Sequence, residues 1–119
     1  MKYLLLFCGN PQDTEAWEAL PEETRAQQYT RAVQWFAEHR SKIRGDHQFY
    51  APYTATSVHF TPNGQPLVTD GPFLEGTEVI GGYAEIEVAD LDEALELAKT
   101  WPLRWPARSV VEIRPIVEQ

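Results

Sequence analysis

The stretch GYAEIEVADLDEALELAKTWP, which spans residues 82–102, decides the fold because it joins a strand pattern directly to a helix pattern. Its first half alternates between apolar side chains and acidic or aromatic ones, as expected for a strand with one buried face. One face carries Ala84, Ile86 and Val88, and the other carries Tyr83, Glu85 and Glu87. This half therefore predicts a strand that covers a hydrophobic core on one side.

The second half of the stretch predicts an amphipathic helix. Asp90 suits the N-cap, and Glu93, three residues later, completes a start that resembles a capping box. Pro102 ends the helix, because proline lacks the backbone N–H that a helix interior needs. An apolar stripe runs along the helix and consists of Leu91, Ala94, Leu95, Ala98 and Trp101.

The rest of the chain supplies further strands and another helix. A continuous apolar run predicts a strand covered on both faces over residues 3–8, followed by a polar connection over residues 10–20. Pro21 suits the first turn of an amphipathic helix over about residues 21–41. Residues 43–50 form an extended segment. Asn63-Gly64 signals a tight hairpin turn between strands at residues 54–60 and 67–69, and the last strand covers residues 109–117.

This order of elements predicts one α+β domain over residues 1–119, a ferredoxin-like split βαβ sandwich with an extra β-hairpin. Two helices can cover only one face of such a sheet. The first strand is apolar on both sides, with Leu4 and Leu6 on one face and the other face made of Tyr3, Leu5 and Phe7. We therefore predict a homodimer whose second subunit covers the Tyr3, Leu5 and Phe7 face. The charged open-face residues, which could make the space between the sheets partly polar, are Glu85, Glu87, Glu112 and Arg114.

Composition and charge exclude several functions. The formal charge of −8 argues against nucleic acid and against anionic membranes as partners, because both require clustered lysine and arginine. Cys8 is the only cysteine, so an internal disulfide is impossible, which fits a reducing compartment. The apolar start is too short for a signal peptide or a membrane span. We expect a cytoplasmic protein.

The segment VTDGPFLEGTEVIGGY, residues 68–83, is rich in glycine and in acidic residues. It is not a phosphate loop, because its Gly-Gly pair leads into a strand and the segment contains no lysine. The oxygen atoms of Asp70, Glu75 and Glu78 could bind a metal ion, but their spacing is not that of a calcium loop. A solvated acidic loop is the preferred interpretation, and we predict neither a metal nor a cofactor.

One candidate for acid–base chemistry is a histidine–aspartate pair on the hairpin. If Asn63-Gly64 is a two-residue turn, His59 faces Val68 and Ser57 faces Asp70, which makes His59 and Asp70 diagonal neighbours. Such a pair could act as a general base oriented by a carboxylate. A structural cross-strand hydrogen bond is the simpler interpretation. His47 is the alternative catalytic histidine.

The motifs described above resemble the YCII-related family, in particular its DGPF subgroup. The similarity covers nearly the whole chain, through MKYLLLFCG, TAT, VTDGPFLEGTEVIGGY, VADLDEALELAKTWP and VEIRPI in this order. Positions that match the subgroup pattern are Asp70, Gly71, Pro72, Phe73, Glu75, Glu78, Gly81, Gly82 and Tyr83. The resemblance implies a dimeric α/β-barrel fold. It implies little about activity: some relatives are proposed enzymes with a His–Asp pair, and others are linked to sigma-factor systems.

Two functional hypotheses follow. The first is a small-molecule pocket protein or acid–base enzyme that acts on a small aromatic or carbonyl compound. In it Asp70 and His59 perform the chemistry, while the ligand-binding residues are Phe73, Glu75, Tyr83 and Arg114, with Arg114 holding an anionic group. The second is a non-catalytic regulatory dimer that docks a protein of a transcription system. Subgroup members commonly carry Thr-Lys where this chain has Gly76-Thr77, so the loop lacks a cation that could contact an anionic ligand.

Overall fold

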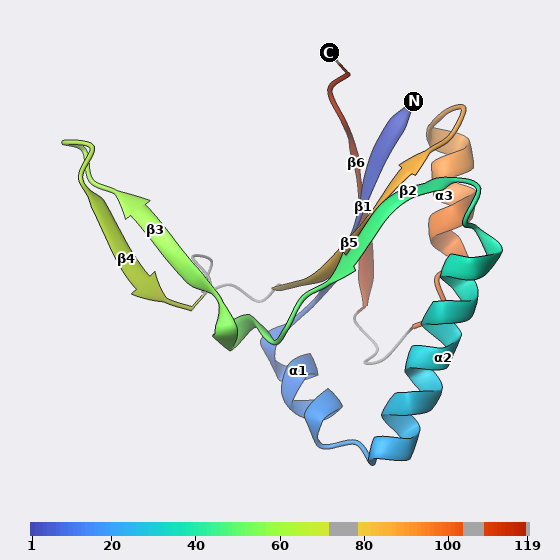
Figure 1. Ribbon diagram of the computed structural model, residues 1–119, viewed down its shortest axis with the longest axis horizontal. Helices are drawn as coiled ribbons and strands as arrows, with labels where there is room; N and C mark the ends of the chain where they lie inside the picture. The colour runs from blue at the N-terminus through green and yellow to red at the C-terminus, as the bar shows by residue number, and fades with distance from the viewer. Residues whose placement is uncertain (72–78, 104–108, 119) are drawn as a thin grey trace.

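The computed structural model describes residues 1–71, 79–103 and 109–118, apart from the side chains of residues 11 and 12. Strands alternate with helices along the chain, and a hairpin projects from the rest of the molecule (Figure 1). In chain order the elements are β1 (Lys2–Gly9), α1 (Pro11–Glu18), α2 (Glu22–Glu38), β2 (Ile43–Gln48), the 3₁₀ helix η1 (Pro52–Thr54), β3 (Thr56–Phe60), β4 (Pro66–Asp70), β5 (Val79–Glu87), α3 (Leu91–Lys99) and β6 (Val110–Pro115).

The main sheet has four strands in the order β2-β5-β1-β6, and its neighbouring strands are antiparallel. The two strands at the centre, β1 and β5, each lead into a helix that returns to an edge strand. This arrangement confirms the predicted α+β fold with a four-stranded sheet and an added hairpin. The hairpin, β3 and β4, is inserted between β2 and β5 and forms a separate sheet of two strands.

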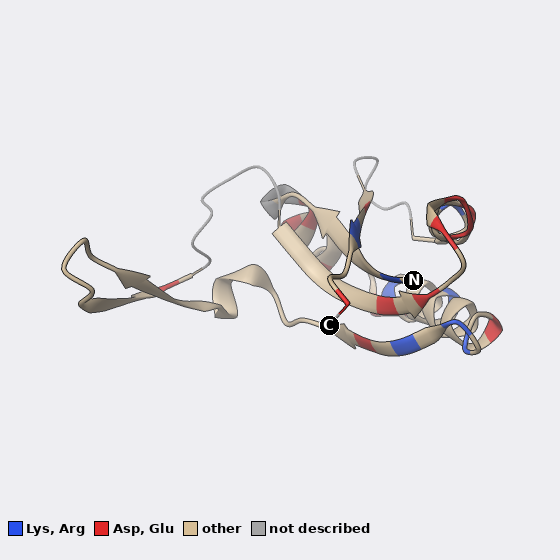
Figure 2. Ribbon diagram, turned by 90° about the horizontal axis from the view of Figure 1, so that it is seen from above, with Lys and Arg blue, Asp and Glu red and all other residues tan. Residues whose placement is uncertain are grey.

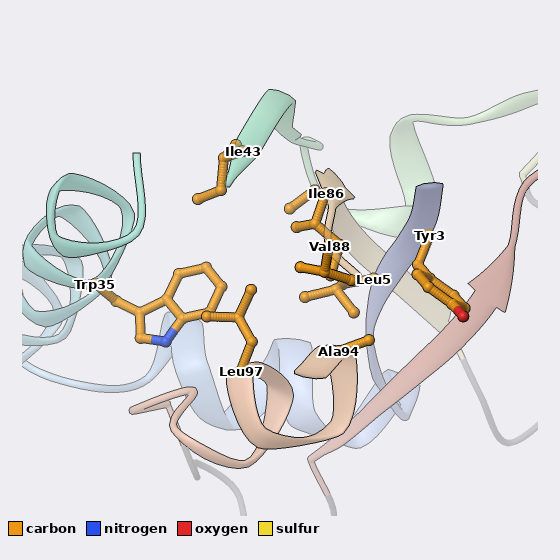
Figure 3. Packing of buried hydrophobic residues seen from close by; sticks show 9 residues of the cluster. Tyr3, Leu5, Trp35, Ile43, Ile86, Val88, Ala94 and Leu97 are labelled. Carbon is orange, nitrogen blue, oxygen red and sulfur yellow. The ribbon is translucent and has the colours of Figure 1, made fainter. Parts of the chain in front are cut away.

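The hydrophobic core lies between the main sheet and the helices α2 and α3, which stand on the same side of the sheet (Figure 2). The sheet contributes Tyr3 and Leu5 from β1 and Ala84 and Ile86 from β5, which face one another in the register. Figure 3 shows Tyr3, Leu5 and Ile86 together with Trp35 of α2 and Leu97 of α3. The alternation predicted for residues 83–88 is confirmed.

The assignment of the two faces of β1 is corrected by this packing. We expected a second subunit to cover Tyr3, Leu5 and Phe7, but the helices of the same chain already pack against them. The open face instead carries Leu4 and Leu6. Across the register Leu4 is paired with Glu85 and Arg114, and Leu6 with Tyr83 and Glu112. The acidic side chains of β5 and β6 could not show which face of β1 is open. Alternation divides the residues of a strand between two faces, but it does not say which face a helix covers.

Helix α3 begins as predicted, with a side-chain oxygen of Asp90 accepting from the Glu93 N–H at 2.9 Å. The Glu93 carboxylate in turn accepts from the Ala89 N–H at 2.9 Å. The buried face of α3 contains Ala94 and Leu97, whereas Leu91, at 50%, is exposed. Within the described part of the chain, no helix is long and apolar enough to cross a membrane.

Helix α1 corrects the expected polar connection over residues 10–20. Asn10 and Asp13 form a capping box, in which the Asn10 side chain accepts from the Asp13 N–H and the Asp13 carboxylate accepts from the Asn10 N–H. Asparagine is a strong N-cap, and a proline follows it in the first turn. The sequence thus contains the signals of a helix start. The helix was not predicted because the segment has few hydrophobic residues.

The hairpin register also differs from the expected one. His59 is paired with Leu67 and Thr56 with Asp70, one residue away from the predicted pairing. The loop is longer than two residues, because the Thr61 N–H bonds to the Gln65 carbonyl at 2.9 Å and the Gly64 N–H to the Thr61 carbonyl at 2.8 Å. A two-residue turn at Asn63-Gly64 would need an N–H from Pro62, which proline lacks. Gly64, with φ +80°, supplies the left-handed residue of the longer loop.

Gly82 is required where β2 lies against β5. A Cβ atom built at this position would lie 2.7 Å from the His47 carbonyl oxygen and 3.3 Å from Cα of Gln48. Both neighbours are backbone atoms, which cannot move aside as a side chain can. Gly82 therefore permits the close approach of β2, which carries the backbone toward the 3₁₀ helix η1.

Candidate functional site

A cleft of about 930 Å³ lies where the end of β1 meets α1, α2 and the segment from β2 to η1. Eight aromatic side chains contribute to its lining, and we call it the aromatic cleft. Its rings belong to Phe7, Trp17, Tyr29, Phe36, Phe49, Tyr50, Tyr53 and Trp101. A cleft of this size and composition can hold a small planar ligand.

Ring packing holds the walls of the aromatic cleft in place. Phe7 stacks on Trp101 with centroids 4.1 Å apart, and Phe36 meets Phe7 edge-on at 6.4 Å. Trp17 of α1 meets Tyr29 of α2 edge-on at 5.4 Å. Aromatic pairs in these geometries contribute stabilisation beyond the area that they bury. The walls are thus built from contacts between elements that are distant in the chain.

Two pairs of polar side chains in the aromatic cleft are joined by hydrogen bonds. The Tyr53 hydroxyl donates to a Glu18 carboxylate oxygen at 3.2 Å, and the Gln48 side-chain amide donates to the Tyr29 hydroxyl at 3.1 Å. The hydrogen bond to Glu18, followed by the charge of Glu18, raises the pKa of Tyr53. Tyr53 therefore stays protonated at neutral pH and acts as a hydrogen-bond donor.

Arg25, in the second turn of α2, differs from these polar groups. It lines the aromatic cleft, and its Nε atom is buried without a hydrogen-bond partner. Among the described residues no carboxylate forms an ion pair with it. A buried donor without a partner is rare in proteins, since the missing hydrogen bond costs about 1–3 kcal/mol.

The hairpin residues predicted to perform chemistry are not brought together. In the observed register the side chains of His59 and Asp70 alternate onto opposite faces of the hairpin, so the reason for pairing them is lost. Nε2 of His59 lies 2.9 Å from the hydroxyl of Thr69 instead. Asp70 is exposed, and neither residue is among those that line the aromatic cleft. Their catalytic roles stay predictions.

Other predicted site residues fall in different places. Phe73 and Glu75 lie outside the described residues, as does Glu78 of the metal hypothesis. His47 and Tyr83 are directly opposite each other on the open face, with ring centroids 5.7 Å apart, and His47 also borders the aromatic cleft. Arg114 lies on the open face, 3.6 Å from a Glu112 oxygen, and does not line the cleft.

Sequence reasoning did not identify the aromatic cleft. A third of its lining comes from α1, which was not predicted, and from the connection after β2. The signal that could have found it is the run FYAPY at residues 49–53, where three aromatic residues follow the strand without strand periodicity. Aromatic side chains clustered in a connecting segment need a cover or a ligand.

Fold and site together describe an α+β protein with a helix-covered antiparallel sheet and an aromatic cleft at the end of its first strand. The chain belongs to the YCII-related domain family, whose model matches residues 1–119. It is similar to an uncharacterised protein of Rhizobium meliloti, R00369, with 32% identity over 116 residues that make up 98% of this chain and 92% of that protein.

A solved structure has a similar fold. It is 5-chloro-2-hydroxyhydroquinone dehydrochlorinase, TftG, of Burkholderia phenoliruptrix in complex with 2,5-dihydroxybenzoquinone. The comparison covers 100% of this chain and 96% of that one, with a TM-score of 0.54 and 11% sequence identity. At this identity the likeness concerns the fold alone.

Proposed function

We propose that this protein binds a small aromatic or carbonyl compound in the aromatic cleft and performs acid–base chemistry on it. The observation that carries the proposal is the cleft itself, about 930 Å³ in volume, whose lining includes aromatic rings that the fold holds in place. Support also comes from the structural neighbour, which is in complex with a hydroxylated quinone. The DGPF motif at residues 70–73 supports membership of the DGPF subgroup.

Ligand binding is tested by filling the aromatic cleft. Ala32 of α2 lines the cleft, so Ala32→Phe places a ring inside it. Ala26 of the same helix does not line the cleft, and Ala26→Phe is the matched control. The probes are hydroquinone and 2,5-dihydroxybenzoquinone, and binding is followed through the fluorescence of Trp17 and Trp101, which both line the cleft.

In the unsubstituted protein and in Ala26→Phe, both probes should quench the tryptophan fluorescence. The quenching should reach a plateau as the probe concentration rises. Ala32→Phe should weaken binding by about tenfold or more, because a filled pocket loses the apolar contacts that hold a small ligand. Circular dichroism checks that each variant is folded. Absence of saturable binding in the unsubstituted protein would overturn the proposal.

His47 is the residue to which we assign the acid–base role. It borders the aromatic cleft and follows Asp46, whose carboxylate is held by Arg40 at 3.2 Å. A histidine is suited to proton transfer near neutral pH. The probe is 5-chloro-2-hydroxyhydroquinone, the compound in the name of the structural neighbour, and chloride release is measured.

His47→Gln should lower the rate of chloride release by about 100-fold or more, within the range that general acid–base groups contribute. His59→Gln and Asp70→Asn should leave the rate nearly unchanged, because both residues lie on the hairpin, apart from the aromatic cleft. A loss in either hairpin variant that equals the loss in His47→Gln would return the chemistry to the hairpin.

We also propose that the protein is a homodimer, an arrangement common to the catalytic hypothesis and to the alternative of a regulatory module. The helices α2 and α3 cover one side of the sheet, while the other carries Leu4 and Leu6. The hairpin supports the same proposal, since its apolar side chains Val58, Phe60 and Val68 are exposed. An isolated hairpin of two strands is marginally stable in water, so it gains from a cover.

A further inference from the structure

We propose that the ligand of the aromatic cleft is an anion and that Arg25 binds its charged group. The inference rests on the proposed function, because it names the chemical class of compound that the cleft takes. It replaces the role predicted for Arg114, which lies beside Glu112 on the open face of the sheet. The class is an aromatic acid, either a ring carboxylate or a hydroxyquinone, whose hydroxyl is acidic because it is conjugated to a carbonyl.

The position of Arg25 on α2 accounts for its unusual surroundings. The residue is held in the helix by a backbone hydrogen bond from its N–H to the Pro21 carbonyl at 3.1 Å. Its side chain lines the aromatic cleft, while the Nε atom is buried by the surrounding protein and has no acceptor. The guanidinium group presents its donors in a planar fork that matches a carboxylate. The buried Nε atom is out of reach of a ligand, so an anionic ligand would be bound by the terminal N–H groups of the guanidinium.

None of the described carboxylates of the aromatic cleft forms an ion pair with Arg25, and each has another partner. Asp13 accepts from the Asn10 N–H at 2.8 Å, Glu18 accepts from the Tyr53 hydroxyl, and Asp46 is paired with Arg40. Five other basic side chains form ion pairs, namely Arg40, Lys42, Arg44, Lys99 and Arg114. Arg25 has no ion pair with a described carboxylate, so its guanidinium can bind an anionic ligand.

The rings of the aromatic cleft define the remainder of the ligand. Phe7, Trp101 and Tyr29 offer flat apolar surface, and the phenol of Tyr53 adds a donor. A planar ring with one anionic group would place its face on the aromatic walls and its charge at Arg25. An aliphatic acid would use Arg25 but leave the aromatic walls unused.

The experiment compares an anionic probe with a neutral one of the same ring size. The anion is 2,5-dihydroxybenzoate, and the neutral probe is hydroquinone, which lacks the carboxylate. Dissociation constants are measured calorimetrically for the unsubstituted protein, Arg25→Gln and Arg25→Lys. Arg31→Gln is the matched control, because Arg31 is exposed on the same helix, does not line the aromatic cleft and undergoes the same change of charge.

Arg25→Gln should weaken binding of 2,5-dihydroxybenzoate by about 10-fold to 100-fold, the range for hydrogen bonds to a charged group. Binding of hydroquinone should change by less than about threefold, and Arg31→Gln should resemble the unsubstituted protein. Arg25→Lys should retain part of the preference for the anion, because it keeps the charge but loses the fork. Added salt should weaken binding of 2,5-dihydroxybenzoate but not binding of hydroquinone.

The outcomes separate this inference from the proposed function. Equal binding of the two probes by the unsubstituted protein, or an unchanged preference in Arg25→Gln, overturns the role of Arg25 while the cleft remains a binding site for aromatic compounds. Binding of neither probe overturns the proposed function and this inference with it. Circular dichroism of each variant shows that a loss of binding is not a loss of folding.

Discussion

Gly82 shows how a single residue sets the path of the backbone toward the aromatic cleft. A methyl group there would lie 2.7 Å from the carbonyl oxygen of His47, so β2 would have to move away from β5. We predict that Gly82→Ala lowers the free energy of unfolding by about 1–3 kcal/mol, as overpacking does. Chemical denaturation provides the measurement.

Gly45 of β2 offers the control for that substitution. A Cβ atom at Gly45 would have no neighbour within 4 Å, so Gly45→Ala should be neutral or slightly stabilising through the unfolded state. If the two alanine variants proved equally stable, the close approach at Gly82 would not constrain the fold.

Thr100 supports the buried indole of Trp35, the aromatic anchor of α2. The indole N–H donates to the Thr100 hydroxyl at 2.8 Å, and that hydroxyl donates to the Leu97 carbonyl at 2.7 Å. Thr100→Ala should lower the free energy of unfolding by about 1–3 kcal/mol, because it leaves the indole donor without a partner. Thr100→Ser keeps the hydroxyl and should lose clearly less in the same denaturation experiment. Similar losses in both variants would show that the methyl group matters more than the hydrogen bond.

Individual residues differed in how far the sequence revealed their roles. Asp90 was predictable as an N-cap because its hydrogen bonds are local, within four residues along the chain. The close approach at Gly82 was not, since the atom that it must avoid belongs to a strand 35 positions away. Arg25 could not be recognised as a ligand-binding residue either. Its lack of a hydrogen-bond partner at Nε arises only in the folded cleft.

At the scale of elements, α3 contains a carboxylate whose protonation should weaken the helix start. The hydrogen bond from the Ala89 N–H is the main cause of the lowered pKa of Glu93, followed by Lys42, whose Nζ lies 3.2 Å from the carboxylate. A pKa lowered by folding stabilises the folded protein fully above the ordinary pKa of glutamate. That stabilisation is lost as the pH falls through the lowered pKa.

The prediction is tested by comparing the protein with Glu93→Gln between neutral and acidic pH. The amide can still accept from the Ala89 N–H but cannot pair with Lys42 as a charge. The unsubstituted protein should have the higher melting temperature at neutral pH, and the small difference should disappear in acid. A difference that is independent of pH would mean that the charge of Glu93 does not contribute.

The hairpin shows why the elements were easier to predict than their pairing. Both strands and the turn were found from alternation and from Asn63-Gly64, yet the register was displaced by one residue. Pro62 decided the loop, because it cannot supply the N–H that the shorter turn needs. A displacement by one residue moves every side chain to the other face, so the predicted contact between His59 and Asp70 was lost with it.

At the scale of the whole molecule, the fold was predictable and the candidate site was not. Strand and helix periodicities fixed the order of the elements, and that order leaves few arrangements of a sheet with helices on one side. The aromatic cleft depends on the connections, where α1 and residues 49–53 have little periodicity. Its geometry arises from contacts between these segments, such as that of Trp17 with Tyr29.

The shape of the molecule is too extended for a compact domain of its length. The radius of gyration is 16.2 Å, whereas about 13–14 Å is expected for a compact chain of this size. The projecting hairpin accounts for much of the difference (Figure 1). One face of it carries Val58, Phe60 and Val68, which are 54%, 73% and 68% exposed. A homodimer in which each hairpin packs on the second copy would bury this face.

We therefore predict that changing Val58, Phe60 and Val68 together to threonine separates the dimer without unfolding the domain. Threonine keeps the strand propensity, and no hairpin residue belongs to the buried core. The dissociation constant, measured by sedimentation across a dilution series, should rise by about 100-fold or more as the apolar contacts are lost. His59→Thr, on the opposite face of the hairpin, should leave the dimer intact. A monomer at every concentration of the unsubstituted protein would refute the dimer. A triple variant that still dimerises fully would instead show that the open face of the sheet, with Leu4 and Leu6, holds the subunits together.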